Sequence, residues 1–107
     1  MSAEKIRALN DRLRIYGLGG TIVTTATLQA RGAEFVEAAL KKMREFDAFT
    51  EDNDPHHEHD FGRLEVLGEH LFWKIDYYDR ELEYGSEDPA DPSKTTRVLT
   101  LMLPTDY

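Results

Sequence analysis

The segment from Asp52 to Gly62 holds the densest group of side chains that could bind a metal ion or move a proton. Its sequence combines imidazoles with carboxylates, as Asp-Asn-Asp-Pro-His-His-Glu-His-Asp-Phe-Gly. These are ligands that suit Zn²⁺, Mn²⁺ and Fe²⁺ in proteins. One hypothesis is therefore a metal-dependent hydrolase, with zinc or manganese as the metal, a metal-bound water as the nucleophile and Asp76 nearby. The ligands or base would be Asp54, Glu58, His59 and Asp60.

No specific metal-site pattern fits this segment. The metalloprotease pattern that His57 and Glu58 begin needs a second histidine where Phe61 stands. Zinc deaminases need paired cysteines, and the chain has no Cys. The alternative interpretation is structural: a turn whose carboxylates accept hydrogen bonds from backbone amides, with a histidine packed against a sheet. In that interpretation the residues are Asp54, Asp60 and His59.

A second cluster runs from Trp73 to Asp79. Lys74, Asp76 and Tyr78 alternate along an expected strand, so they share one face and could perform acid–base chemistry. Because Lys74 and Asp76 are neighbours on that face, mutual neutralisation is the simpler interpretation. The aromatic residues resemble a stacking platform, but platforms for single-stranded nucleic acid carry a basic rim, and this one has acidic surroundings.

Hydrophobic periodicity and turn residues predict the elements that position these clusters. We expect two helices and four strands in the order α-β-α-β-β-β, within a single domain of residues 1–107. The helices are expected at 2–17 and 33–46, and the strands at 21–28, 62–67, 70–79 and 97–103. This pattern indicates a two-layer α+β fold, with helices on one face of a mainly antiparallel sheet.

Two strands are expected inside that sheet. His70–Asp79 carries aromatic residues on both faces, and Arg97–Leu103 is almost continuously apolar. Gly68-Glu69 would form the turn that precedes the first of them. Thr50–Asp60 and residues 84–95 lack periodicity and contain Asp-Pro pairs, so both are predicted to be loops.

Charge is unevenly distributed along the 107 residues. The net charge is −8, but residues 1–49 contribute +2 and residues 50–107 contribute −10. The acids concentrate between Asp47 and Asp91, together with all four histidines. This balance argues against direct binding to nucleic acid, since phosphate neutralisation by basic residues supplies most of the non-specific affinity. No apolar run long enough for a membrane span occurs, and the amino terminus lacks a signal-peptide pattern, so we expect a cytoplasmic protein without membrane contact.

Several motifs together resemble a small bacterial domain family of unknown function. They are Asn53-Asp54-Pro55-x-x-Glu58-His59-Asp60-Phe61-Gly62, Trp73 to Asp79, Asp88 to Pro92, Thr96 to Thr100 and the closing Asp106-Tyr107. The resemblance extends from about Leu9 to Tyr107, and His57 stands where the family often has Gly. It implies a setting on plasmids and phage-like elements, mostly in alphaproteobacteria, but it implies no activity.

The leading functional hypothesis is a non-enzymatic module without a cofactor, whose acidic face binds a basic protein surface. Within the implied setting, such a module would block a nucleic-acid-binding groove, as an anti-CRISPR-like inhibitor does. A third hypothesis makes both motifs structural, with the acidic loops held to the hairpin through Arg97 or Arg63. The acidic face of the leading hypothesis comprises Asp52, Asp54, Glu58, Asp60, Asp76, Asp79, Glu81, Glu83, Glu87, Asp88 and Asp91.

Overall fold

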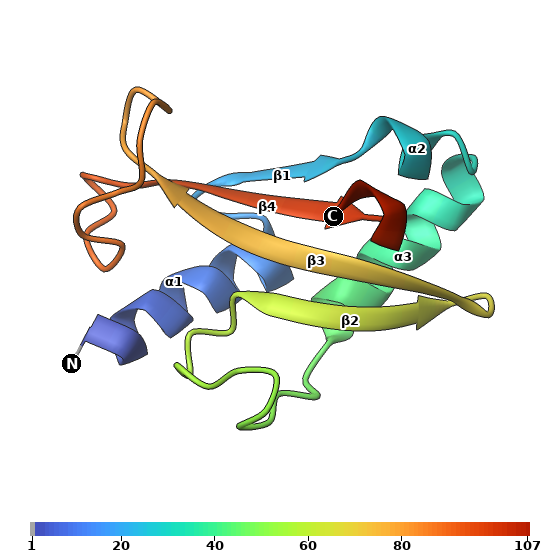
Figure 1. The fold of residues 1–107 in the computed structure, drawn as a ribbon, viewed down its shortest axis with the longest axis horizontal. Helices are drawn as coiled ribbons and strands as arrows, with labels where there is room; N and C mark the ends of the chain where they lie inside the picture. Colours follow the sequence, from blue (N-terminus) through green and yellow to red (C-terminus); the bar gives the residue numbers. More distant parts are fainter. Residues whose placement is uncertain (1) are drawn as a thin grey trace.

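A computed structural model describes residues 2–107 as helices covering one face of a four-stranded sheet (Figure 1). The elements in chain order are α1 (Ser2–Tyr16), β1 (Thr21–Thr24), α2 (Ala26–Gln29), α3 (Ala33–Glu45), β2 (Phe61–Val66), β3 (Glu69–Tyr78), β4 (Thr96–Met102) and a 3₁₀ turn, η1 (Pro104–Asp106). The α+β class is confirmed. Among residues 2–107, no helix combines the length and apolar character needed to cross a membrane.

The sheet has the order β1-β4-β3-β2. β1 pairs with β4 in parallel, whereas β4 with β3 and β3 with β2 pair antiparallel. The two predicted inner strands are therefore confirmed as inner, and the sheet is mainly antiparallel. Leu71, Trp73 and Ile75 of β3 face the helices and are buried, as the alternation predicted.

The core lies between this sheet face and the helices. Buried Phe35, Ala39 and Met43 recur at helical spacing on α3 and pack towards β2. The apolar stripe of α1 contributes buried Ile6 and Leu13, and α1 ends where predicted, because Gly17 adopts a left-handed φ of 71°. Burial of these side chains fixes both helices against the sheet.

Two local predictions are wrong. The strand expected over 21–28 stops at Thr24, because the Thr25 side chain caps α2, a third helix that the pattern did not predict. The hairpin turn is Leu67-Gly68 rather than Gly68-Glu69, since Val66 pairs with Glu69 and both turn residues have positive φ, at 51° and 83°. This geometry is that of a type I′ turn, in which the strand twist is continued through two left-handed residues.

Candidate functional site

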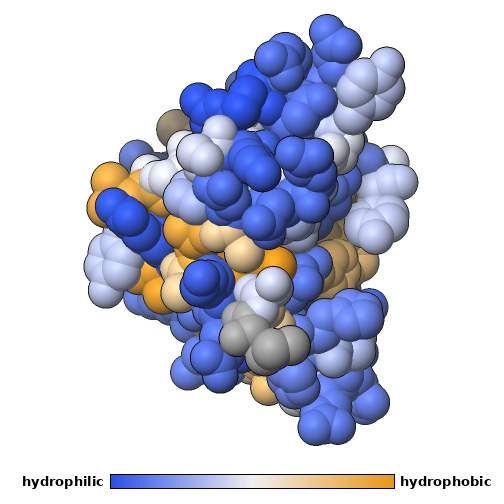
Figure 2. Space-filling model, turned by 90° about the vertical axis from the view of Figure 1, so that its left-hand side faces the viewer, coloured by the Kyte–Doolittle hydropathy of each residue, from blue (hydrophilic) through white to orange (hydrophobic). Residues whose placement is uncertain are grey.

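Both acidic segments lie at the end of the molecule where α1 begins. They are the 46–60 loop, between α3 and β2, and the 79–95 loop, between β3 and β4 (Figure 1). Each contains six Asp or Glu residues; the first contains no Lys or Arg, and the second contains Arg80 and Lys94. We call the two loops together the acidic end, and Figure 2, which faces it, shows a mostly hydrophilic surface.

Asn10 of α1 connects the two loops. Its side chain is fully buried, and its Nδ2 donates to the Glu58 carbonyl at 2.9 Å and to the Tyr77 hydroxyl at 2.8 Å. Its Oδ1 accepts from Nε of buried Arg97 at 2.9 Å, and Arg97 also donates to the Pro89 carbonyl. One side chain therefore joins the 46–60 loop, β3, β4 and, through Arg97, the 79–95 loop.

Asp54 shapes the 46–60 loop from within. The side chain is buried, and its Oδ1 accepts from the backbone N–H groups of Glu58 at 3.0 Å and His59 at 3.1 Å. The backbone N–H of His57 donates to the Asp54 carbonyl at 3.1 Å. This is the turn predicted at Asp54, in which a carboxylate holds backbone amides, and both amides bond the same oxygen, Oδ1.

His59 is held between α1 and the loop. Its Nδ1 lies 2.8 Å from Asp11 Oδ1 and its Nε2 lies 3.5 Å from Asp54 Oδ2. The ring stacks on Phe49 with centroids 3.7 Å apart and an interplanar angle of 3°. Asp11 also pairs with Arg14 at 3.2 Å, so the histidine is part of the contact between the loop and α1.

Glu58 and Asp60 lie half-buried beside this network. The Tyr77 hydroxyl donates to Glu58 Oε1 at 2.9 Å, and burial is the main reason that the pKa of Tyr77 is raised far above its usual value. Burial, and next the charge of Glu58, raise the pKa of Asp60. Within residues 2–107, no three His, Asp or Glu side chains are grouped so that they could hold a metal ion. The metal hypothesis based on Asp54, Glu58, His59 and Asp60 therefore gains no geometric support.

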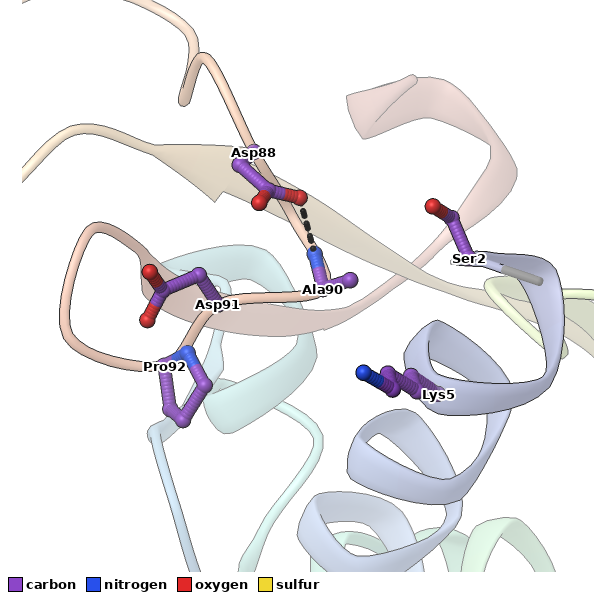
Figure 3. Close-up of a pocket in the computed structure, with 6 residues that line it drawn as sticks. All are labelled: Ser2, Lys5, Asp88, Ala90, Asp91 and Pro92. Atoms are coloured by element: carbon purple, nitrogen blue, oxygen red, sulfur yellow. Dashed lines mark hydrogen bonds between the residues drawn. The ribbon is translucent and has the colours of Figure 1, made fainter.

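Acids of the 79–95 loop that lie near the backbone mostly stabilise turns. Asp79 Oδ1 accepts from the Glu83 N–H at 3.0 Å, and Asp88 Oδ1 accepts from the Ala90 N–H at 3.2 Å (Figure 3). Asp91 accepts from the hydroxyl and N–H of Ser93, which lowers the pKa of Asp91. These hydrogen bonds preorganise the loop. They use the carboxylates of its aspartates and not those of its glutamates.

The glutamates of this loop project into solvent. Glu81, Glu83 and Glu87 are exposed, and only Glu87 forms an ion pair within residues 2–107, with Lys94 at 3.6 Å. Exposed Leu82 and Tyr84 alternate with them. The tip carrying them is fixed, because the Asp79 N–H donates to the Tyr84 carbonyl at 2.8 Å and the Ser86 N–H donates to the Tyr77 carbonyl at 2.9 Å.

The remaining predicted site residues are dispersed. Asp52 is exposed in the 46–60 loop. Asp76 lies on the sheet face opposite the helices and pairs with Lys74 at 2.9 Å, as the strand spacing predicted. A shallow cavity lies between the start of α1 and residues 88–92, where Figure 3 shows Lys5 extending towards Asp91 and Pro92.

Of the residues that hold the loops, sequence reasoning named Arg97, which donates to Asn10 and to the Pro89 carbonyl, but missed two on α1. Asn10 and Arg14 of α1 are buried, and Arg14 donates to the Phe46 carbonyl at 2.8 Å while its guanidinium lies over Phe49 and Trp73. The signal that could have found Asn10 is its position between Ile6 and Leu13 in the apolar stripe of the helix. A polar residue in such a stripe needs buried hydrogen-bond partners.

Fold and site together define a small α+β domain in which a helix holds two acidic loops against a mixed sheet. The chain belongs to the family described as Protein of unknown function (DUF3768), whose model matches residues 24–106. The match leaves α1, which supplies Asn10 and Asp11, outside it. No curated protein and no solved structure matches the chain.

Proposed function

We propose that this domain is a non-enzymatic binding module that presents its acidic end to a basic protein surface. The observation that carries the proposal is that the acids have two different roles. The carboxylates of the aspartates near the backbone stabilise the loops through hydrogen bonds, whereas the glutamates of the 79–95 loop stay exposed. Glu81 and Glu83 are exposed and unpaired within residues 2–107, on a tip that hydrogen bonds keep in one conformation. Clustered negative charge increases the association rate with a basic partner and gives binding that weakens with salt.

Exposed apolar side chains at the same tip supply a second type of contact. Leu82 is 58% exposed and Tyr84 is 72% exposed. Tyrosine is enriched among the residues that dominate binding energy at protein interfaces, and a preorganised tip lowers the entropy cost of association. The tip therefore suits a partner that offers an apolar depression rimmed by Lys or Arg.

In its narrower form the proposal makes the partner a nucleic-acid-binding protein. An acidic module that occupies a basic groove competes with nucleic acid for it, which is how an anti-defence inhibitor of the anti-CRISPR kind would act. The support is the negative charge of the acidic end and the mobile-element setting implied by the family resemblance. A bacterial, cytoplasmic setting is part of the same proposal.

The test is affinity capture with the tagged domain from a lysate of its source cells, followed by binding measurements on the captured protein. Glu81→Gln combined with Glu83→Gln should weaken binding at least tenfold at about 0.1 M salt, where screening is modest. The control, Glu34→Gln combined with Glu37→Gln on exposed positions of α3, makes the same change in net charge and should leave affinity within twofold. A partner retained unchanged in about 1 M salt would contradict the electrostatic account. Competition by a DNA or RNA oligonucleotide tests the narrower form of the proposal. That form fails if the oligonucleotide and the domain bind the captured protein at the same time.

A further inference from the structure

The two edges of the sheet differ in how their backbone is covered. At the β1 edge, the Thr25 N–H donates to the Leu101 carbonyl at 3.2 Å. The backbone N–H and C=O groups of Thr25, and of Val23 and Thr21 before it, therefore point towards β4. The outward groups belong to Ile22 and Thr24, and the Gln29 side chain donates to the Thr24 carbonyl at 3.0 Å. This edge is short and partly covered.

The β2 edge is longer and uncovered. The Ile75 N–H donates to the Asp60 carbonyl at 2.8 Å, which places the hydrogen-bonded pairs at even-numbered residues of β2. The N–H and C=O groups of Phe61, Arg63 and Glu65 therefore point away from β3. Within residues 2–107, none of these backbone groups has a hydrogen-bond partner. Three consecutive outward positions form a template for one more strand.

A groove follows this edge. Two adjoining shallow cavities of about 350 and 400 Å³ lie between β2 and the segment after α3, and they share Phe46, Ala48 and Arg63. The outer wall is fixed, because Asn53 Nδ2 donates to the Ala48 carbonyl and Arg14 donates to the Phe46 carbonyl, each at 2.8 Å. In Figure 1, β2 is the edge strand opposite β1, and the segment that leaves α3 passes beside it. An open strand edge beside a groove that has both apolar and charged walls suits recognition of an extended peptide.

The charged residues along the groove determine which peptide charge is favoured. Its walls carry the acids Glu45, Asp47, Asp52 and Glu65 against the bases Lys42 and Arg63. The net charge of the walls therefore favours a basic peptide.

We propose that β2 is a strand-addition site for an extended basic segment of a partner protein. The segment pairs with the outward backbone groups of Phe61, Arg63 and Glu65, and its alternate side chains enter the groove at Phe46 and Ala48. This site is separate from Glu81 and Glu83, so it stands without the function proposed for the acidic end.

The test is NMR titration with a pool of octapeptides in which Lys or Arg alternates with Val, Ile, Leu or Phe. Binding should shift the amide signals of Phe61, Arg63 and Glu65 and slow their hydrogen exchange at least tenfold. A matched pool with Asp and Glu in place of the basic residues should bind at least tenfold more weakly. No shift with the basic pool, or shifts confined to the 79–95 loop, would overturn the proposal.

Two variants at one position separate backbone pairing from charge. Arg63→Gln keeps the outward N–H, whereas Arg63→Pro removes it without removing a bond to β3. Affinity for the basic pool should fall about tenfold in Arg63→Pro relative to Arg63→Gln. Equal affinities in two folded variants would overturn strand addition, and if the proline variant fails to fold, amide exchange in the unaltered protein decides.

Two further measurements exclude other occupants. Sedimentation of the free protein should show a monomer, and a dimer that Arg63→Pro abolishes would make a second copy the occupant instead. The Glu81→Gln, Glu83→Gln variant should bind the peptide pool normally. Failure of peptide binding therefore leaves the function proposed for the acidic end untouched.

Discussion

The 46–60 loop and the 79–95 loop each contain six acids, three of them exposed, but they use the other three differently. In the first, Asp54 is buried and Glu58 and Asp60 are half-buried, while His59 turns inward onto Phe49. In the second, the acids near the backbone close turns and the glutamates face solvent. The first loop therefore contains a buried carboxylate, whereas no acid of the second loop is more than half-buried.

The contrast shows that how a loop backbone is held, more than its acidic composition, decides whether an acid in it is buried. The 46–60 loop lies against α1, where Asn10 and Arg14 supply buried donors to the loop backbone. The 79–95 loop receives fewer buried donors, chiefly from Arg97 to the Pro89 carbonyl. In the loop held in this way, the backbone N–H groups of Glu58 and His59 donate to Asp54, and a hydrogen-bonded carboxylate can be buried at low cost.

Removing the inner carboxylate of the first loop should produce the largest effect. Asp54→Ala leaves two backbone N–H groups without an acceptor in a buried turn, so we expect a loss of about 2–4 kcal/mol in the free energy of unfolding. Glu81→Ala, the matched change in the exposed loop, should stay within about 0.5 kcal/mol. Urea denaturation followed by Trp73 fluorescence measures both. Equal losses would erase the distinction between the loops.

Glycines at the boundaries of the two loops sharpen the comparison. A Cβ on Gly62 would overlap Nε1 of the Trp73 indole, whereas a Cβ on Gly85 would meet nothing closer than the Tyr77 carbonyl at 3.8 Å. Gly62→Ala should therefore cost about 1–3 kcal/mol through overpacking, and Gly85→Ala should cost less than about 1 kcal/mol. Thermal denaturation of the two variants gives the comparison. A harmless Gly62→Ala would show that Trp73 is free to move.

Features of the two loops and the sheet differ in whether they could be predicted from the sequence alone. Alternation in β3 and the stripe of α3 predicted the sheet and its covering helix, because burial follows a local period. The turn at Asp54 was also predictable, since Asp-Pro patterns carry their own local chemistry. The role of Asn10 was not, because its partners Glu58, Tyr77 and Arg97 are 48, 67 and 87 positions away. Three-dimensional proximity of that kind has no local pattern in the sequence.

Opposite pH dependences should distinguish Asp60 from Asp91. The folded state raises the pKa of Asp60, mainly through burial, so the stability this carboxyl contributes is present below its unfolded pKa and is lost as pH rises through its folded pKa. The Ser93 hydrogen bonds lower the pKa of Asp91, so its contribution is present above its unfolded pKa and is lost as pH falls through its folded pKa.

Substitution of each aspartate by asparagine tests the direction of its pH-dependent contribution to stability. At pH 7, Asp60→Asn should melt above the unaltered protein and Asp91→Asn slightly below it. The Asp60→Asn difference should shrink as pH falls towards about 4, near the usual aspartate pKa, whereas the Asp91→Asn difference should persist down to about 4 and shrink only below it. Melting curves from pH 3 to 8 measure the effect, and differences of the same sign would show that the two carboxyls have similar environments.

Backbone strain gives the smallest expected effect and occurs in both loops. His57 has φ 59° and Leu82 has φ 60°, a region that costs an L-residue about 1–2 kcal/mol. His57→Gly removes that cost but adds chain entropy to the unfolded state, so we expect a net gain of up to about 1 kcal/mol. The neighbouring change His56→Gly, at a residue without positive φ, should instead cost about 0.5–1 kcal/mol.

Leu82→Gly extends this test to the exposed loop. It should give a similar gain in stability, because the strain is of the same kind, but Leu82 is exposed at the tip proposed to contact a partner. The two glycine variants should therefore separate in binding: His57→Gly keeps affinity within twofold, and Leu82→Gly loses it. Denaturation and affinity measured on the same samples decide this. If Leu82→Gly gained stability and kept full affinity, the left-handed leucine would have no part in binding, and the contact would rest on Tyr84 and the glutamates alone.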